Sequence, residues 1–217
     1  MHVHAMVRPR ALVVLGHGAG RGVDTDDLQD LAERLPSRGV SVVLVDQPWV
    51  VQGRRVASAP PALDEAWVPA VAAARAAAGA SSRTPLVVGG RSAGARVACR
   101  TCHRTSPDAL LLIAFPLLPP SARRSRETRD AALAARAAEL GAPVDLGVPV
   151  VVAQGERDGF GTPDQVRASL AGTPAAALDV RAVPGADHGM RVRRGGPDPA
   201  DALLEAALRA VARARGE

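Results

Sequence analysis

The stretch that constrains the fold most is Pro85-Leu86-Val87-Val88-Gly89-Gly90-Arg91-Ser92-Ala93-Gly94-Ala95. An apolar run typical of a strand leads into a glycine-rich turn, and a segment typical of a helix follows it. The turn matches Gly-x-Ser-x-Gly, which between a strand and a helix is typical of a nucleophile elbow. The serine of such an elbow has strained backbone geometry, so Gly90 and Gly94 must lack side chains if strand and helix are to pack closely. The alternative is a glycine-rich turn whose Ser92 has no chemical role.

On both sides of this turn, short runs rich in Val, Leu and Ile alternate with longer segments rich in Ala, Arg and Glu. We expect strands at Ala11–Leu15, Val40–Val45, Pro85–Val88, Ala109–Ala114, Val148–Ala153 and Leu178–Val183. Continuous apolar runs of this length indicate burial on both faces of a sheet, which is typical of parallel strands.

Helices are expected between and after these strands, at Asp24–Ser37, Ala62–Ala78, Ser92–Thr105, Glu127–Leu140, Pro163–Leu170 and Pro199–Arg213. Asp24 and Asp198 place acidic side chains where first-turn N–H groups have no partner, and Gly39, Gly79 and Gly141 stand where helices should stop. Six strands with intervening helices predict an α/β fold with a doubly wound, mostly parallel sheet.

A chain of 217 residues with 47% hydrophobic residues is large enough for one α/β domain to bury a full core. We find no internal repeat and no linker long enough to separate two domains, and only Pro116–Arg126 resembles an extended loop. Residues 1–217 are therefore expected to form a single domain.

Composition excludes several classes of partner. The formal net charge is +5, all 27 basic residues are arginine, and aromatic residues make up 2% of the chain. A nucleic-acid binder concentrates its positive charge and interleaves aromatic side chains, whereas these arginines alternate with Asp and Glu. No apolar run approaches the roughly 20 residues of a membrane span, and residues 1–10 contain no signal-peptide core, so we expect no membrane partner and a cytoplasmic location.

Cys99 and Cys102 precede His103, and this spacing matches the pattern for covalent haem attachment. Such attachment occurs on exported proteins, and these cysteines fall inside an expected helix. A lone Cys-x-x-Cys pair is also insufficient for structural zinc, which takes four ligands. We interpret both cysteines as small buried thiols, with the haem and zinc interpretations as alternatives.

An acid and a histidine follow two of the later strands. Asp158 lies in a turn just after the strand Val148–Ala153, and His188 lies in a short loop after Leu178–Val183. Ligands bind at the carboxyl edge of such sheets, and the order serine, acid, histidine is that of an α/β-hydrolase triad. Glu156 and Asp187 are competing acids; Asp158 has the better reach to the imidazole, and Glu156 is the fallback.

The first expected strand ends in Leu15-Gly16-His17-Gly18-Ala19-Gly20, where glycines allow backbone N–H groups to face a cavity. An oxyanion hole needs two such donors. We expect them to be the amide of Ala93, after the nucleophile, and the amide of Ala19. His17 is expected to be structural.

With these pieces placed, the chain resembles the α/β-hydrolase superfamily over nearly its full length. Five motifs carry the resemblance: Gly-His-Gly-Ala-Gly at 16–20, Gly-Gly-Arg-Ser at 89–92, Phe-Pro-Leu at 115–117, Gln-Gly-Glu-Arg-Asp at 154–158 and Asp-His at 187–188. They look like a small lidless branch that includes the testis-expressed protein 30 type and the hydrolase-like part of a histone-acetyltransferase complex subunit.

The resemblance implies a compact fold without a large lid and a triad of Ser92, Asp158 and His188. The chain departs from the branch at Ala93 and Ala95, where Met and Gly are usual, and at 118–120, where Leu-Pro-Pro replaces His-Pro-Pro. Some members of the branch are scaffolds, so a non-catalytic interaction module is the alternative function.

We therefore predict a serine hydrolase that cleaves an ester, thioester or similar acyl bond and needs no metal or cofactor. Its partner is a small acyl substrate. Arginines fall near all the expected site loops, among them Arg91, Arg123 and Arg191, and we expect these three to bind an anionic group of the substrate.

Overall fold

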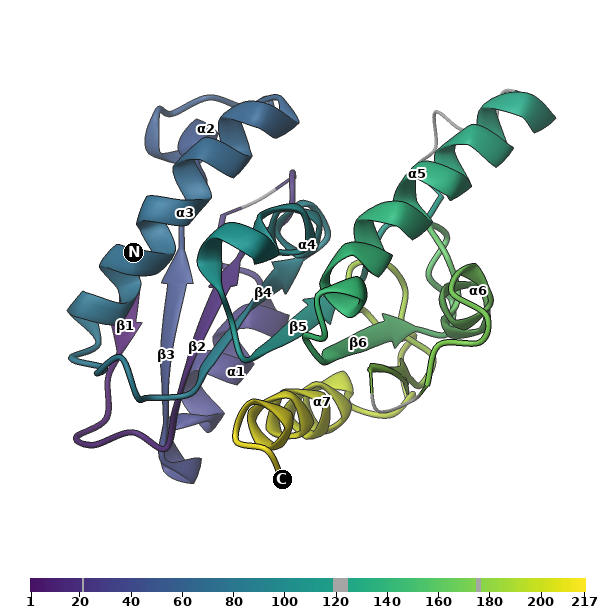
Figure 1. Ribbon diagram of the computed structural model, residues 1–217. Coiled ribbons are helices and arrows are strands. Elements are labelled where there is room, and N and C mark those ends of the chain that lie inside the picture. Colours follow the sequence, from purple (N-terminus) through teal and green to yellow (C-terminus); the bar gives the residue numbers. More distant parts are fainter. Residues whose placement is uncertain (21, 119–124, 175–176) are drawn as a thin grey trace.

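The computed structural model describes residues 1–20, 22–118, 125–174 and 177–217. Within them, seven strands form one sheet in the order β1-β3-β2-β4-β5-β6-β7 (Figure 1). All neighbouring strands are parallel except β1, which pairs antiparallel with β3. The strands are β1 His2–His4, β2 Ala11–Gly16, β3 Val40–Val45, β4 Leu86–Arg91, β5 Ala109–Ile113, β6 Val150–Gly155 and β7 Leu178–Val183.

Helices cover both faces of this sheet (Figure 1). Their bounds are α1 Asp26–Arg34, η1 Pro36–Arg38, α2 Pro48–Val51, α3 Pro60–Ala77, α4 Ala93–Thr105, α5 Arg126–Asp145, α6 Pro163–Ser169 and α7 Pro199–Ala214. Residues of α1 and α7 pack into one hydrophobic cluster, whereas those of α3, α4 and α6 pack into a second cluster on the opposite face. The architecture is therefore a three-layer α/β fold.

The side chains of β2 show why an unbroken apolar run predicts a central strand. Val13 and Leu15 belong to the cluster under α1 and α7, and Leu12 and Val14 belong to the cluster under α3 and α4. Successive side chains of a strand point to opposite faces, so a strand that is covered twice needs apolar residues at every position.

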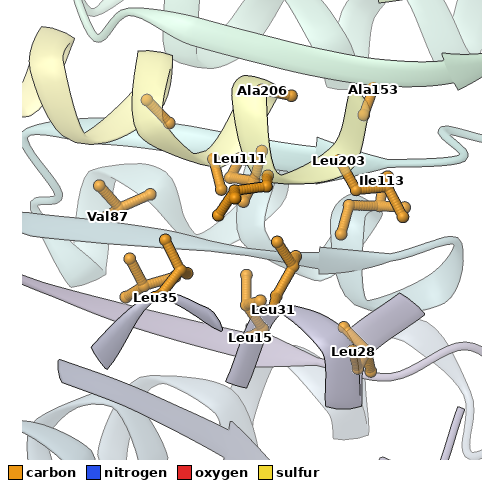
Figure 2. Close-up of a cluster of buried hydrophobic side chains, with 14 of the residues drawn as sticks. Leu15, Leu28, Leu31, Leu35, Val87, Leu111, Ile113, Ala153, Leu203 and Ala206 are labelled. Carbon is orange, nitrogen blue, oxygen red and sulfur yellow. The ribbon is translucent and has the colours of Figure 1, made fainter. Parts of the chain in front are cut away.

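Figure 2 shows the cluster under α1 and α7. Leu28 and Leu31 of α1 are spaced three residues apart, which puts both on the helix face that meets Leu15 of the sheet. Leu203 of α7 lies near Ile113 of β5 in the same cluster. This packing holds the two helices against the sheet whose carboxyl edge carries the candidate site.

The predicted α/β fold with a mostly parallel sheet is confirmed, with three differences. Strand β1 was not predicted, because three largely exposed residues give no hydrophobic pattern. Helix α5 continues through Gly141 to Asp145, and Gly147, with φ of 75°, follows its end. The short helix α2 was also not predicted.

Residues 119–124 of the expected extended loop lie outside the described residues. Among the residues that are described, no helix combines the length and apolar character needed to cross a membrane.

The turn between β4 and α4 is fixed by glycines that face another backbone. A Cβ on Gly90 would lie 2.3 Å from the carbonyl oxygen of Gly16, and a Cβ on Gly94 would lie 2.5 Å from the same oxygen. Both distances are far inside van der Waals contact, so only glycine allows β2 and the turn to approach this closely. The motif is thus required by packing as well as by local conformation.

Replacement of Gly90 by alanine should therefore lower the free energy of unfolding by about 1–3 kcal/mol, because the new methyl group must displace the end of β2. Urea denaturation measures the change. Gly20→Ala is the matched control, since a Cβ there meets nothing within 4 Å. Equal stability of the two variants would contradict this account of the turn.

Candidate active site

Ser92 lies at the tip of the turn between β4 and α4, with φ of 51° and ψ of −105°. A non-glycine residue in this region costs roughly 1–3 kcal/mol and persists only where its surroundings enforce it. The Ser92 amide donates a hydrogen bond to the Ile113 carbonyl at 2.9 Å, and the Ser92 carbonyl accepts one from the Arg96 amide at 3.2 Å. These bonds and the close glycine contacts hold the side chain at the carboxyl edge of the sheet.

His188 and Asp158 complete a chain of hydrogen bonds that begins at Ser92. Ser92 Oγ lies 3.1 Å from His188 Nε2, and His188 Nδ1 lies 2.9 Å from Asp158 Oδ2 and 3.0 Å from Oδ1. A carboxylate can only accept, which assigns the proton of the neutral imidazole to Nδ1. The Nε2 lone pair then faces the Ser92 hydroxyl, as a general base requires.

Asp158 is buried, with a side chain 0% exposed, and its carboxylate is held by three donors. Besides His188, the Gln154 side-chain amide donates to Oδ2 at 2.9 Å and the Phe160 backbone amide donates to Oδ1 at 2.7 Å. A buried carboxylate is tolerated when it is hydrogen-bonded in this way. The donors also fix which direction the carboxylate presents to the imidazole.

The two competing acids have other partners. Glu156 is exposed and accepts a hydrogen bond from the Gly185 amide at 2.8 Å. Asp187 Oδ1 accepts from the amides of Gly189 and Arg191 at 2.8 and 3.0 Å, which shapes the loop that carries His188. Of the three acids, Asp158 is the one whose carboxylate contacts the His188 ring.

Two residues that the sequence analysis missed surround this chain of bonds. Gln154 is fully buried, and besides Asp158 its amide contacts the carbonyls of Phe115 and Gly161. Phe160 stacks on the His188 ring, with centroids 4.0 Å apart and an interplanar angle of 23°. Gln154 could have been found as the polar side chain in an otherwise apolar strand, and Phe160 as one of two phenylalanines in the chain.

His17 is fully buried and structural, as expected. The Gln47 amide donates to His17 Nε2 at 2.8 Å, so Nδ1 carries the proton and donates to the Gly18 carbonyl at 2.8 Å. Trp49 contacts the imidazole edge-on, with centroids 5.0 Å apart. These contacts tie the loop after β2 to the end of β3.

The same loop lies against the nucleophile. A Cβ on Gly18 would be 3.4 Å from Ser92 Cβ, and a Cβ on Gly16 would be 2.9 Å from the Trp67 ring. Ala19 follows in an exposed turn, and Ala93 is the first residue of α4, where N–H groups have no partner within the helix. The two expected oxyanion donors therefore belong to segments on either side of Ser92.

The three arginines expected to bind substrate differ in placement. Arg91 was expected to face substrate, but its Nε lies 3.0 Å from the buried Asp27 carboxylate and its Nη2 donates to the His188 carbonyl at 2.9 Å. Internal partners thus engage this guanidinium. Arg191 is exposed in the loop after His188, and Arg123 lies outside the described residues.

Cys99 and Cys102 are buried on the face of α4 that packs into the core. Burial raises the pKa of the Cys99 thiol well above its usual range and that of Cys102 to about 11. Both thiols are therefore protonated at neutral pH and are poor nucleophiles and metal ligands. Within the described residues, no group of three or more His, Cys, Asp or Glu side chains is arranged to hold a metal ion.

The family of the chain follows from a sequence comparison. A model of the alpha/beta hydrolase domain matches residues 9–215, nearly the whole chain. The chain belongs to this family. No curated protein matches it.

Solved α/β-hydrolase structures share the fold at low identity. A serine hydrolase homologue from Coxiella burnetii is 15% identical over 95% of this chain and 86% of its own, with a TM-score of 0.65. A serine hydrolase without a lid from Xanthomonas campestris is 19% identical over 94% and 84%, with a TM-score of 0.62. Est1E from Butyrivibrio proteoclasticus, with bound ferulic acid, is 13% identical over 97% and 94%, with a TM-score of 0.72. At these identities the likeness establishes the fold alone.

Proposed function

We propose that this α/β hydrolase is a serine hydrolase that cleaves an ester, thioester or similar acyl bond through an acyl-enzyme intermediate. The observation that carries the proposal is the continuous hydrogen-bonded chain from Ser92 through His188 to Asp158, with Ser92 in strained backbone geometry. A nucleophile beside a base that a third group orients is the arrangement that activates a hydroxyl.

In this reaction Ser92 Oγ attacks the acyl carbonyl carbon, and its proton passes to His188 Nε2. The carbonyl oxygen becomes an oxyanion, which the amides of Ala19 and Ala93 stabilise. Collapse of the tetrahedral intermediate breaks the bond to the leaving oxygen or sulfur, which takes the proton from His188. A water molecule then attacks the acyl-enzyme by the same route and releases the acid. Asp158 holds the imidazole tautomer and stabilises the imidazolium.

Ser92→Ala should lower kcat/KM for a p-nitrophenyl ester by about 10³-fold or more, because the nucleophile is lost. A fluorophosphonate should label the wild-type protein at Ser92 and leave the variant unlabelled. A folded wild-type protein that neither reacts nor hydrolyses any ester would contradict the proposal and favour the non-catalytic interaction module.

Asp158→Asn should lower kcat by about 10³- to 10⁴-fold, because asparagine favours the wrong imidazole tautomer. Glu156→Gln is the matched control: it makes the same chemical change two residues away on an exposed side chain, and its activity should stay near wild type. Steady-state kinetics on one ester compares the two. The opposite ranking would assign the acid role to Glu156.

A groove beside the triad supports an anionic acyl substrate. Gly159, between Asp158 and Phe160, lines a cavity of about 600 Å³ together with Leu118 and Arg129. A second cavity of about 400 Å³ continues past Leu118 and Arg129 to apolar side chains of α5, including Leu133. The Leu118 amide donates to the Phe160 carbonyl at 2.6 Å, so the groove begins next to the residue that stacks on His188.

The charge of this groove comes from arginine. Arg126 and Arg129 both line it, and none of the ion pairs among the described residues involves Arg129. A guanidinium without an ion-pair partner among the described residues, and beside apolar side chains, suits an acyl chain that ends in a carboxylate or phosphate. Arg191, exposed beside His188, would add to the positive field around the groove. We propose that Arg123 also contributes to this field.

Arg129→Gln should reduce kcat/KM for a carboxylate-bearing ester by about tenfold at low ionic strength and leave a short neutral ester unaffected. Salt should reduce the difference, because it screens exposed charges. Arg83→Gln is the control: it removes the same charge near the opposite, amino end of β4. It should leave kcat/KM unchanged for both esters. Equal, salt-independent rates on the two esters would rule out selection for anionic substrates.

We also propose a narrower family branch, a single-domain organisation and a cytoplasmic location. The narrower placement, in the lidless branch that includes the testis-expressed protein 30 type and the hydrolase-like part of a histone-acetyltransferase complex subunit, rests on the five motifs quoted from the sequence. The single-domain organisation over residues 1–217 and the cytoplasmic location likewise rest on the sequence.

A further inference from the structure

Arg91 is the last residue of β4 and directly precedes Ser92 in the chain. Its side chain is 14% exposed and points inward to three segments. Nε lies 3.0 Å from Oδ2 of Asp27, Nη2 donates to the carbonyl of His188 at 2.9 Å, and Nη1 lies 2.8 Å from where a Cβ of Gly18 would be. The guanidinium therefore contacts helix α1, the histidine loop and the loop that carries Ala19.

The contact with His188 concerns the backbone, whereas Asp158 holds the ring. Within the described part of the chain, Arg91 is the hydrogen-bond donor to the His188 carbonyl. Arg91 is also covalently joined to Ser92. The same residue is thus linked to both residues of the 3.1 Å contact between Ser92 Oγ and His188 Nε2.

Asp27 in turn fixes the guanidinium. Its side chain is 4% exposed and lies in the first turn of α1, where Oδ1 accepts a hydrogen bond from the Leu28 amide at 3.1 Å. The Nε to Oδ2 contact is an ion pair without an aligned hydrogen bond. Buried ion pairs add little net stability because of the cost of desolvation, but their partners have few alternative positions.

We infer that Arg91, held by Asp27, is a positioning residue that sets the distance between Ser92 and His188. This inference rests on the proposed serine hydrolase function. Arginine suits the role because its planar guanidinium directs Nη2 to the His188 carbonyl while Nε lies beside the Asp27 carboxylate. A lysine at position 91 keeps the charge beside Asp27 but has a single nitrogen, which cannot reproduce this geometry. Arg91→Lys therefore separates the effect of the positive charge from the effect of the guanidinium geometry.

Arg91→Lys should lower kcat for a short neutral p-nitrophenyl ester by about 10- to 100-fold, because a displacement of about 1 Å between reacting groups has a cost of this size. KM should change by less than about threefold, since the substrate-binding surface is retained. Asp27→Asn, which keeps the size of the side chain, should lower kcat in the same direction and by less.

Arg100→Lys is the matched control. Arg100 is 17% exposed and makes a comparable ion pair with Asp64, through Nε and Nη2 at 2.7–3.1 Å, at a position on α4 remote from His188. It should lose stability to a similar degree in urea denaturation and keep the kcat of the wild type. A merely structural role for Arg91 would make the two lysine variants behave alike.

A readout independent of turnover is the downfield proton resonance of His188 Nδ1–H, assigned by its absence from Asp158→Asn. It should shift or broaden in Arg91→Lys and stay unchanged in Arg100→Lys. A folded Arg91→Lys protein with wild-type kcat and an unchanged resonance would overturn the inference. A wild-type protein that no fluorophosphonate labels would instead overturn the proposed function, and the resonance would still show whether Arg91 holds His188.

Discussion

At the end of β2, one backbone lies directly on another: the carbonyl oxygen of Gly16 fills the space that side chains of Gly90 and Gly94 would need. This close approach lets β4 turn sharply into α4 and leaves Ser92 in strained geometry at the edge of the sheet. It also brings the loop after Gly16 against the nucleophile, where an oxyanion hole would form. The placement of the nucleophile and of the loop after β2 therefore depends on this contact.

A second contact of the same kind supports the other half of the site. A Cβ on Gly155 would lie 2.5 Å from the carbonyl of Ala186, so the turn after β6 packs on the loop after β7. Asp158 and His188 come from these two segments. Gln154, at the end of β6, then orients the Asp158 carboxylate toward Nδ1 of the imidazole. Backbone packing thus sets the coarse separation of acid and base, and a buried amide sets their orientation.

What could be predicted from the sequence depends on how local the signal is. Apolar runs predict the central strands, and glycines whose spacing is fixed by local geometry predict the elbow. Because Ser92, Asp158 and His188 each follow a strand, the sequence predicted that all three lie at one edge of the sheet. In the structure they lie within hydrogen-bond distance of one another there, in the order Ser92, His188, Asp158. Strand β1 carries no such pattern, since its pairing with β3 depends on a partner forty residues away.

The direction in which the Arg91 side chain points could not be predicted from the sequence. Arg91 adjoins the nucleophile, so position alone favoured contact with substrate, but Asp27, more than sixty residues earlier, turns the guanidinium inward. Helix α5 passes through Gly141 because tertiary packing overrides the weak local preference of one glycine to end a helix. For Arg91 the deciding partner is distant in the chain, and no local pattern encodes it.

The two tryptophans of the chain both lie beside the loop that ends β2. Trp49 contacts His17 edge-on, and the Trp67 ring touches Gly16. The chain contains no tyrosine, and its two phenylalanines emit only weakly, so these two indoles dominate its ultraviolet emission. The protein therefore carries a built-in optical reporter: any occupant or rearrangement at the loop bearing Ala19 alters the surroundings of its only strong fluorophores, without a label being attached.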